Sequence, residues 1–350
     1  MTFKIANKNI GQDFKPFIIA EMSGNHNQKI DLALQLVDAA ADAGVDAIKL
    51  QTYTADSMTL DIKGGDFEIK DANSLWKGES LYSLYKKAST PWDWHPEIYK
   101  RASERGIICF SSPFDEKAVD FLEELDTPAY KIASFENNHI PLIKKVAETG
   151  KPILVSTGMA SLSELERCVK TIRECGNEKI LLLKCTSSYP ASPKSSNIKT
   201  IPHLRNLFQC EVGLSDHTLG LGVPLASISL GACLIEKHFT LKRSDGGVDS
   251  AFSLEPEEFK SLVKESKTAW ESLGEIKYGF TSSEKNSLIF KRSIYVIKDI
   301  KKGDKFNNDN IKVIRPGGGA PPYLYASILG KVAQKNFKRG QPLTFDTIIC

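Results

Sequence analysis

The chain has 350 residues, of which 41% are hydrophobic and 25% charged, the composition of an ordinary globular protein with ample material for a core. At roughly 150 residues per domain, this length favours two domains. Lysine and arginine number 46 against 43 for aspartate and glutamate, a balance that gives no support to a nucleic-acid-binding surface. No apolar run is long enough to cross a membrane, and the N-terminus lacks the apolar core of a signal peptide, so we expect a cytoplasmic protein.

The seven cysteines argue against a zinc ribbon or a disulfide framework, because their number is odd, their spacings are wide and no CxxC pair occurs. Several lie inside apolar runs, as Cys109 and Cys233 do. We therefore expect reduced, buried cysteines.

Eight short apolar runs predict strands that are buried on both faces of a parallel sheet. They cover residues 17–21, 47–51, 107–112, 129–134, 152–157, 180–187, 211–217 and 234–239. Amphipathic helices are predicted between most of them, at 29–43, 115–125, 161–175 and 255–273. Gly44 is a helix stop, Asp115 is a plausible N-cap, and Ser161 with Glu164 forms a capping-box pattern. Residues 190–210 are rich in Pro and Ser and are left unassigned.

This alternation predicts a (β/α)8 TIM barrel over residues 1–274, with a doubly wound open sheet as the structural alternative. Residues 52–93 are too long for a bare connection and suggest a lid over the barrel mouth. We expect residues 275–290 to be a linker that packs on the barrel. Residues 291–350 show short alternating strands and no long helix, which predicts a small β-rich domain.

Polar residues end all eight predicted strands, and in such barrels the chemistry is built at these carboxyl ends. Lysines and hydroxyls there can hold a phosphate or carboxylate. His217 and His238 can offer imidazoles to a divalent metal, and Glu21 could be a third ligand or a base. Each of these residues could equally be structural, and Lys131 also permits a Schiff-base mechanism. No glycine motif for nicotinamide or ATP binding is present.

The motifs at these strand ends resemble, in order and over nearly the whole chain, the sialic acid (nonulosonic acid) synthase family. They are FIIAEMSGNHN, AIKLQTY, SSPFDEKAVDFL, AYKIASFE, ILVSTGMAS, LLKCTSSYPA, GLSDHT and EKHFT. KVIRPGGGAPP resembles the family's antifreeze-like (SAF, β-clip) domain. Within the family, AEMSGNHNQ and GDFEIKDANSLWKG are most similar to the pseudaminic acid synthases.

The resemblance implies that phosphoenolpyruvate condenses with 2,4-diacetamido-2,4,6-trideoxy-L-altrose to give pseudaminic acid and phosphate with C–O cleavage. A divalent ion, Mn²⁺ or Mg²⁺, would polarise the sugar aldehyde. Because phosphoenolpyruvate is already an enol nucleophile, the resemblance argues against a lysine imine. An N-acetylneuraminate or legionaminate synthase with the same mechanism stays open. A more remote alternative from another class is a non-catalytic glycan- or ice-binding protein.

The resemblance also assigns roles to single residues. Glu21, His217 and His238 are the catalytic group, and the two histidines are the metal ligands. The phosphoenolpyruvate side comprises Lys49, Ser112, Lys131, Ser134, Ser156, Ser187 and Ser215. The sugar side comprises Gln51, Tyr189, Asp249 and Arg315.

Three further points concern single positions of this chain, its assembly and its lid. Ser187 stands where the family often has Asn. Arg315 is expected to reach the site of a partner subunit, which implies a domain-swapped homodimer. The lid segment 62–80 is expected to discriminate the deoxy sugar through an apolar patch at Phe67 or Trp76.

Overall fold

The computed structural model describes residues 2–71 and 74–348. The chain divides into two compact units, one ending at Gly274 and the other beginning at Glu275. We describe each unit by itself.

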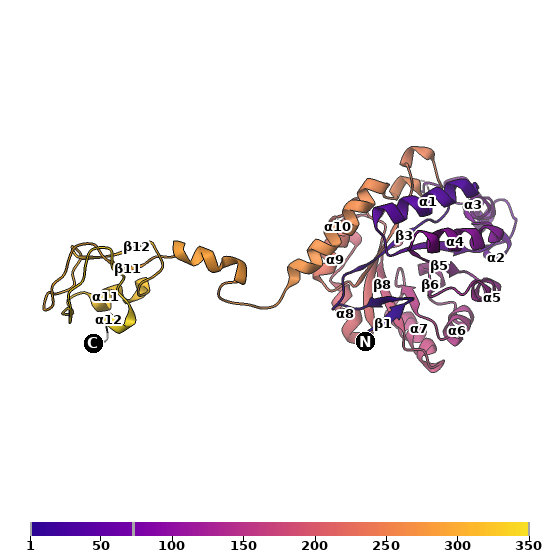
Figure 1. Cartoon of the computed structure of the whole chain (residues 1–350). Coiled ribbons are helices and arrows are strands. Elements are labelled where there is room, and N and C mark those ends of the chain that lie inside the picture. Colours follow the sequence, from indigo (N-terminus) through magenta and orange to yellow (C-terminus); the bar gives the residue numbers. More distant parts are fainter. Residues whose placement is uncertain (1, 72–73, 349–350) are drawn as a thin grey trace. The chain divides into compact units, whose positions relative to one another are not determined.

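In the described part of the first unit, eight parallel strands close into a barrel in the order β10-β3-β4-β5-β6-β7-β8-β9 (Figure 1). Closure confirms the TIM barrel and excludes the open sheet. The strands are β3 (Phe17–Glu21), β4 (Ala47–Thr52), β5 (Ile108–Pro113), β6 (Tyr130–Ile132), β7 (Ile153–Ser156), β8 (Ile180–Cys185), β9 (Glu211–Asp216) and β10 (Leu234–His238).

The strands are continuous apolar runs because one face of each packs in the barrel interior and the other packs against the helices. In β8, Leu181 and Leu183 pack in the barrel interior, whereas Leu182 points outward into the layer between strands and helices. This alternation holds along every strand. It decides which polar residues at the strand ends face the mouth.

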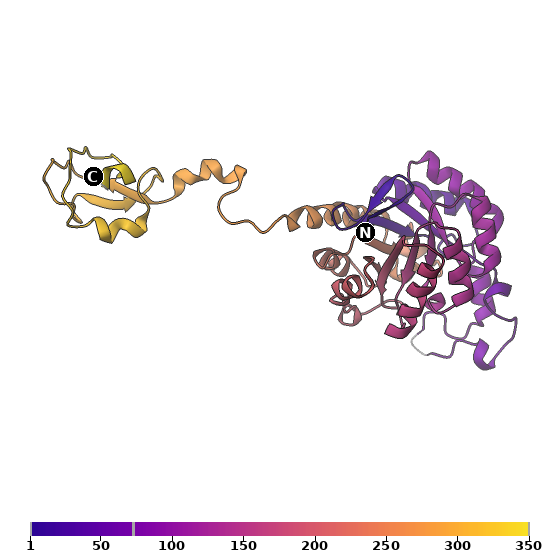
Figure 2. The same cartoon turned by 90° about the horizontal axis from the view of Figure 1, so that it is seen from below.

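Helices surround the barrel in both views (Figures 1 and 2). They are α1 (Ile30–Ala43), α4 (His95–Glu104), α5 (Glu116–Glu124), α6 (Ile140–Glu148), α7 (Leu162–Glu174), α8 (Thr200–Phe208), α9 (Gly222–Ser229) and α10 (Pro256–Leu273). The predicted termini are confirmed: Gly44 ends α1 at a φ of 83°, and Asp115 caps α5 by accepting from the Ala118 amide. Ser161 and Glu164 form the capping box of α7. The unassigned segment 190–210 contains α8 and the 3₁₀ turn Pro193–Ser195.

A hairpin that the sequence did not reveal closes the N-terminal end of the barrel. It pairs β1 (Phe3–Ile5) with β2 (Lys8–Ile10), and Ile5 and Ile10 pack against the interior apolar residues of the barrel. The buried carboxylate of Asp46 accepts from Lys8 at 3.1 Å and ties the hairpin to the barrel. The opposite end is left as the mouth.

The lid segment 52–93 contains α2 (Ala55–Met58), the 3₁₀ turn Gly65–Phe67, α3 (Leu81–Ala88) and the 3₁₀ turn Trp92–Trp94. Residues 72–73 of this lid lie outside the described residues. Two fully buried histidines fasten its base. His26 contacts Thr90 at 3.2 Å, and His95 contacts Thr52 at 2.9 Å.

The second unit is built around the antiparallel pair β11 (Ser293–Val296) and β12 (Ile311–Ile314). Its helices are short: α11 (Tyr325–Ile328), α12 (Phe345–Ile348) and the 3₁₀ segments Ser282–Phe290 and Pro322–Leu324. Ile294, Phe306 and Phe337 belong to its own apolar core. The Gly317 amide donates to the Ile289 carbonyl at 3.1 Å, so the end of segment 275–290 packs within this unit.

The six described cysteines are free, and all but the half-buried Cys175 are buried; Cys350 lies outside the described residues. Within the described residues, no helix combines the length and apolar character needed to cross a membrane.

Candidate active site

Strand alternation gathers polar side chains at the carboxyl end of the barrel interior. In the parallel register, Glu21 lies beside both Lys49 and His238, because β3 runs between β4 and β10. Ser215 likewise lies beside Glu236, on the neighbouring strand β10. These residues continue the inward-facing rows that are apolar deeper in the barrel, where the interior is packed with Phe17, Leu234 and similar side chains.

A small inner cavity of about 60 Å³ opens among these side chains. All predicted site residues except Ser187, Asp249 and Arg315 line it: Glu21, Lys49, Gln51, Ser112, Lys131, Ser134, Ser156, Tyr189, Ser215, His217 and His238. Ala133, Cys185 and Glu236 complete the lining.

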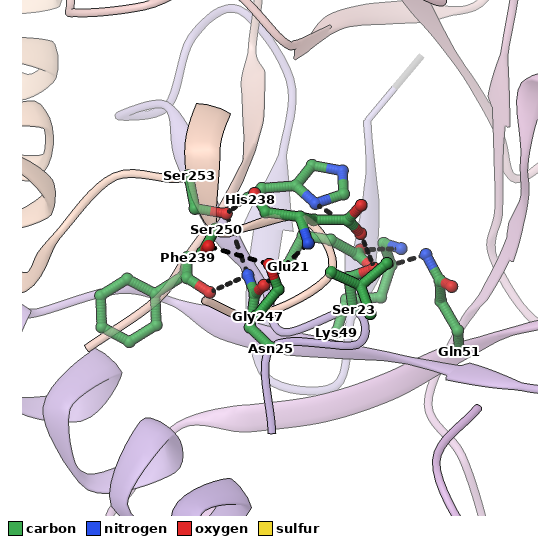
Figure 3. Close-up of polar contacts among 12 residues, drawn as sticks. Glu21, Ser23, Asn25, Lys49, Gln51, His238, Phe239, Gly247, Ser250 and Ser253 are labelled. Atoms are coloured by element: carbon green, nitrogen blue, oxygen red, sulfur yellow. Dashed lines mark hydrogen bonds and ion pairs between the residues drawn. The ribbon is translucent and has the colours of Figure 1, made fainter. Parts of the chain in front are cut away.

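One side of the inner cavity is organised around the buried ion pair of Lys49 and Glu21 (Figure 3). Gln51 Nε2 donates to Glu21 Oε1 at 3.1 Å, and Lys49 Nζ donates to Ser112 Oγ at 3.2 Å. Burial lowers the pKa of Lys49 to about 7, although the nearby carboxylate of Glu236 acts to raise it. This lysine can therefore hold an anion whose charge stabilises its protonated form.

The other side is organised around Glu236, a residue that sequence reasoning placed at a strand end but gave no role. Its Oε1 lies 3.5 Å from Lys131 Nζ and accepts from Ser215 Oγ at 3.0 Å. Burial alone would raise the pKa of Glu236, but Lys131 and Lys49 lower it. Its Oε2 and the hydroxyl of Ser156 are buried without a hydrogen-bond partner, so both are available to a ligand.

The two predicted metal-binding histidines come together at the rim, with ring centroids 5.2 Å apart. His217 Nδ1 lies 3.0 Å from the Thr186 carbonyl, an arrangement that fixes the ring and leaves Nε2 for other contacts. Burial, followed by the nearby positive charges, lowers the pKa of His238 well below its usual value. Its imidazole is therefore neutral, as a metal ligand must be. His238 Nδ1 is buried without a hydrogen-bond partner and lies 3.5 Å from Asp249 Oδ2.

The implied divalent ion would therefore have two imidazoles, those of His217 and His238, as its protein ligands. Among the described residues, no group of three or more His, Cys, Asp or Glu side chains is arranged to hold a metal, and Glu21 is engaged by Lys49. Burial acts to lower the pKa of His217, but Cys185 and the Thr186 carbonyl raise it, so this imidazole gives up its proton when an ion binds. Two imidazoles fit an ion whose other ligands come from substrate and water.

Cys185 is a residue of the inner cavity that the sequence did not single out. Its Sγ accepts from Ser134 Oγ at 3.3 Å and lies 3.9 Å from His217 Nδ1. Burial alone would raise the pKa of this thiol, but His217 lowers it to about 7. Strand alternation was the signal that could have found Cys185, since it shares the inward row of Leu181 and Leu183.

A larger cavity of about 420 Å³ adjoins the inner one, with Gln51, Ser134, Tyr189 and His238 lining both. The lid supplies most of its apolar wall: Tyr53, Met58, Ile69, Trp76, Leu81, Leu84 and Tyr85, with Phe114 from beyond the lid. Its polar groups include Ser23, Glu136 and Asp249. Burial raises the pKa of Glu136 to about 7 and also raises the pKa of Asp249, which accepts from the hydroxyl of Ser23.

The remaining predicted residues lie at the edges of the two cavities or outside them. Ser187 Oγ is 3.9 Å from Cys185 Sγ, next to the inner cavity. Trp76 lines the larger cavity and donates from Nε1 to the Val248 carbonyl at 3.1 Å, whereas Phe67 is not among the lining residues. Arg315 is exposed in the second unit.

Comparison with known proteins places this site in a family. Residues 36–278 match the model of the NeuB family, and residues 291–349 match that of the SAF domain. The chain is 44% identical to the pseudaminic acid synthase of Campylobacter jejuni over 96% of its own length and 97% of the relative. It is 38% identical to the N,N'-diacetyllegionaminic acid synthase of the same species, over 93% of this chain and 98% of that one.

A solved structure shares the fold. The N-acetylneuraminic acid synthetase of Leptospira borgpetersenii, in complex with citrate, superimposes with a TM-score of 0.73 at 31% identity. The match covers 82% of this chain and 95% of that one. The chain belongs to the NeuB family and carries an SAF domain at its C-terminal end.

Proposed function

We propose that this protein is a pseudaminic acid synthase. It condenses phosphoenolpyruvate with 2,4-diacetamido-2,4,6-trideoxy-L-altrose and water to give pseudaminic acid and phosphate. The observation that carries the proposal is the 44% identity to a pseudaminic acid synthase over 96% of the chain. The inner cavity, with its two buried lysines and several hydroxyls, and the adjoining, largely apolar cavity support it.

The inner cavity suits the phosphate and carboxylate of phosphoenolpyruvate. Lys49 and Lys131 bring two buried ammonium groups to it, and the hydroxyls of Ser134, Ser156 and Ser215 add directional donors. The free hydroxyl of Ser156 gains a partner when an anion binds. Each lysine is paired with a buried glutamate, and its attraction for a substrate anion is strengthened by burial because little water competes for it.

The reaction joins C3 of phosphoenolpyruvate to the aldehyde carbon of the sugar. Water adds to C2, and phosphate leaves with cleavage of the C2–O bond. Glu21 lies between Lys49 and His238, where a carboxylate can take a proton from the water that adds to C2. Gln51 holds the other oxygen of Glu21 and thereby fixes its orientation.

The larger cavity suits the acceptor sugar. Its apolar wall from Tyr53 to Phe114 can receive the two acetamido methyl groups and the C6 methyl group of a trideoxy sugar. N-acetylmannosamine has hydroxyls at C4 and C6, and this wall would leave them without hydrogen-bond partners. Gln51, Glu136 and Asp249 remain for the sugar hydroxyls and amides.

We propose that His217 and His238 hold a divalent ion, Mn²⁺ or Mg²⁺, which when bound polarises the acceptor aldehyde. The neutral state of His238 supports this assignment. His217→Ala or His238→Ala is expected to abolish metal-dependent turnover and to weaken binding of Mn²⁺ measured by calorimetry in the absence of substrate. Full activity in either variant would remove the metal assignment.

We also propose, from the family resemblance, that Arg315 completes the acceptor site of a second copy in a domain-swapped homodimer. Its exposure within the second unit is consistent with this role. Arg315→Ala is expected to raise mainly the KM for the acceptor. A change in the KM for phosphoenolpyruvate alone would contradict the proposal.

The test of the function is phosphate release from phosphoenolpyruvate with the trideoxy altrose, with and without a chelator. We expect chelator-sensitive release of one phosphate per pseudaminic acid formed. No release in metal-replete buffer with this sugar, the legionaminate precursor or N-acetylmannosamine would contradict the synthase assignment.

A further inference from the structure

We propose that two buried asparagines, Asn25 and Asn137, are positioning residues for the two substrates. Asn25 holds the acceptor side of the site and Asn137 holds the phosphoenolpyruvate side. Neither is among the residues that line the two cavities. The inference rests on the proposed function for the identity of the substrates and on the contacts below for everything else.

Asn25 follows β3 and is 2% exposed, and it uses both ends of its amide in the interior (Figure 3). Its Nδ2 donates to the Phe239 carbonyl at 2.8 Å and to Ser253 Oγ at 2.9 Å. Its Oδ1 accepts from the Asp249 amide at 3.1 Å. One side chain near the start of the barrel therefore fixes three points of a segment more than 200 residues later in sequence.

The segment that Asn25 fixes faces the acceptor. It carries Asp249, which lines the larger cavity, and Phe252, whose ring centroid lies 4.9 Å from that of His238. The segment packs directly on the asparagine, because a Cβ at Gly247 would come within 2.7 Å of Asn25 Oδ1. Loss of the amide of Asn25 would release Asp249 and Phe252 together.

Asn137 makes the corresponding contacts on the other side of the mouth. It is 4% exposed, and its Nδ2 donates to the Ser156 carbonyl at 3.3 Å and to the Gly158 carbonyl at 3.1 Å. The turn that it holds is tightly packed, since a Cβ at Gly158 would collide with the hydroxyls of Ser134 and Ser187. Asn137 thus sets the spacing between two strand ends that carry predicted phosphoenolpyruvate contacts.

Asn177 provides a matched control in the same chain. It is 3% exposed, and its Nδ2 donates to the Lys151 carbonyl at 2.8 Å while its Oδ1 accepts from the Lys179 amide at 2.9 Å. It precedes β8 and therefore lies at the end of the barrel opposite the mouth. Its substitution removes a similar buried amide without touching the site.

The experiment replaces each asparagine with Ala and compares steady-state constants at saturating metal. We expect Asn25→Ala to raise the KM for the acceptor by about tenfold or more, which corresponds to at least 1.4 kcal/mol, with little change for phosphoenolpyruvate. Asn137→Ala should show the opposite pattern. Asn177→Ala should lower the urea midpoint of unfolding without changing either KM.

Hydrogen exchange without substrates gives a readout that does not depend on activity. Asn25→Ala should speed exchange in residues 239–253, and Asn137→Ala in residues 156–160, whereas Asn177→Ala should change neither segment. If an alanine variant does not fold, Asn→Asp at the same position removes the donations and retains the volume. The inference would be overturned if Asn25→Ala and Asn137→Ala changed both KM values equally. It would also be overturned if hydrogen exchange in these two variants were indistinguishable from that in Asn177→Ala. If the wild-type protein turned over no acceptor, the proposed function would be wrong. Hydrogen exchange in the two segments would then still test whether Asn25 and Asn137 position them.

Discussion

Lys237 and Asp216 form a buried ion pair directly behind the two histidines of the site, with Nζ 2.6 Å from Oδ2. Asp216 precedes His217 and Lys237 precedes His238 in the sequence. Because neighbouring residues of a strand point to opposite faces, the ion pair lies outside the barrel while His238 faces its interior. Lys237 Nζ also donates to the Thr218 carbonyl at 2.6 Å, so the pair joins the ends of β9 and β10.

Lys237→Met should strongly destabilise the protein, because it leaves the carboxylate of Asp216 buried without its partner. We expect a loss of about 3–5 kcal/mol in the free energy of unfolding, measured by urea denaturation. The double variant Asp216→Asn/Lys237→Met should recover most of that loss. As a control, Lys145→Met, which breaks an exposed pair with Asp120, should leave the free energy nearly unchanged. Equal stability of Lys237→Met and wild type would contradict the structural role of the pair.

Binding of phosphoenolpyruvate should weaken as the pH rises through about 7, the lowered pKa of Lys49. Below that pH the ammonium is charged and attracts the anion, and above it the neutral amine does not. We therefore expect kcat/KM for phosphoenolpyruvate, which reports the free enzyme, to fall on the alkaline side.

The pKa of the Cys185 thiol is also lowered to about 7, so the variant Cys185→Ala separates the two groups. The alkaline fall persists in this variant if Lys49 is responsible. Its disappearance there would assign the fall to the thiol.

Acid should destabilise the base of the lid through His26 and His95. Burial lowers the pKa of each from 6.5 to about 4, so the folded protein holds both rings neutral. The stabilisation is complete above about pH 6.5 and is lost progressively as the pH falls from there to about 4, by up to roughly 3 kcal/mol for a single histidine. Urea denaturation between about pH 7.5 and 4.5 measures the loss, and His95→Gln should reduce it. The same pH dependence in His26→Gln/His95→Gln as in wild type would show that other groups are responsible.

Trp76 should contribute to acceptor binding, because it lines the larger cavity and bonds to the loop that carries Asp249. Trp76→Ala is expected to raise the KM for the acceptor by about tenfold, and Trp76→Phe by less, because it loses only the indole hydrogen bond. Phe67→Ala serves as the control in the same lid and should leave the KM unchanged. A larger effect at Phe67 than at Trp76 would reverse the assignment of the apolar patch.

Much of the fold and the inner site could be predicted because local patterns encode them. Apolar runs predicted the eight barrel strands, and their polar ends predicted the mouth. Strand alternation could have gone further, since it separates Glu236, which faces the cavity, from Lys237, which faces the helices.

The rest depends on contacts that no local pattern carries. The hydrogen-bond partners of Asn25 lie in the segment from Phe239 to Ser253, at the far end of the barrel domain in sequence, and no pattern around Asn25 indicates them. The N-terminal hairpin has strands of three residues, too short for a periodic signal, and it is fixed by tertiary packing of Ile5 and Ile10.

The most direct test of the central claim is a competition among acceptors. Limiting phosphoenolpyruvate is offered to equal amounts of the trideoxy altrose, the legionaminate precursor and N-acetylmannosamine. Each acceptor carries a different isotopic label, so that stereoisomeric products differ in mass. The account predicts that nearly all of the product carries the label of the altrose. Product formed mainly from either competitor would retain the chemistry of the inner cavity but contradict the assignment as a pseudaminic acid synthase.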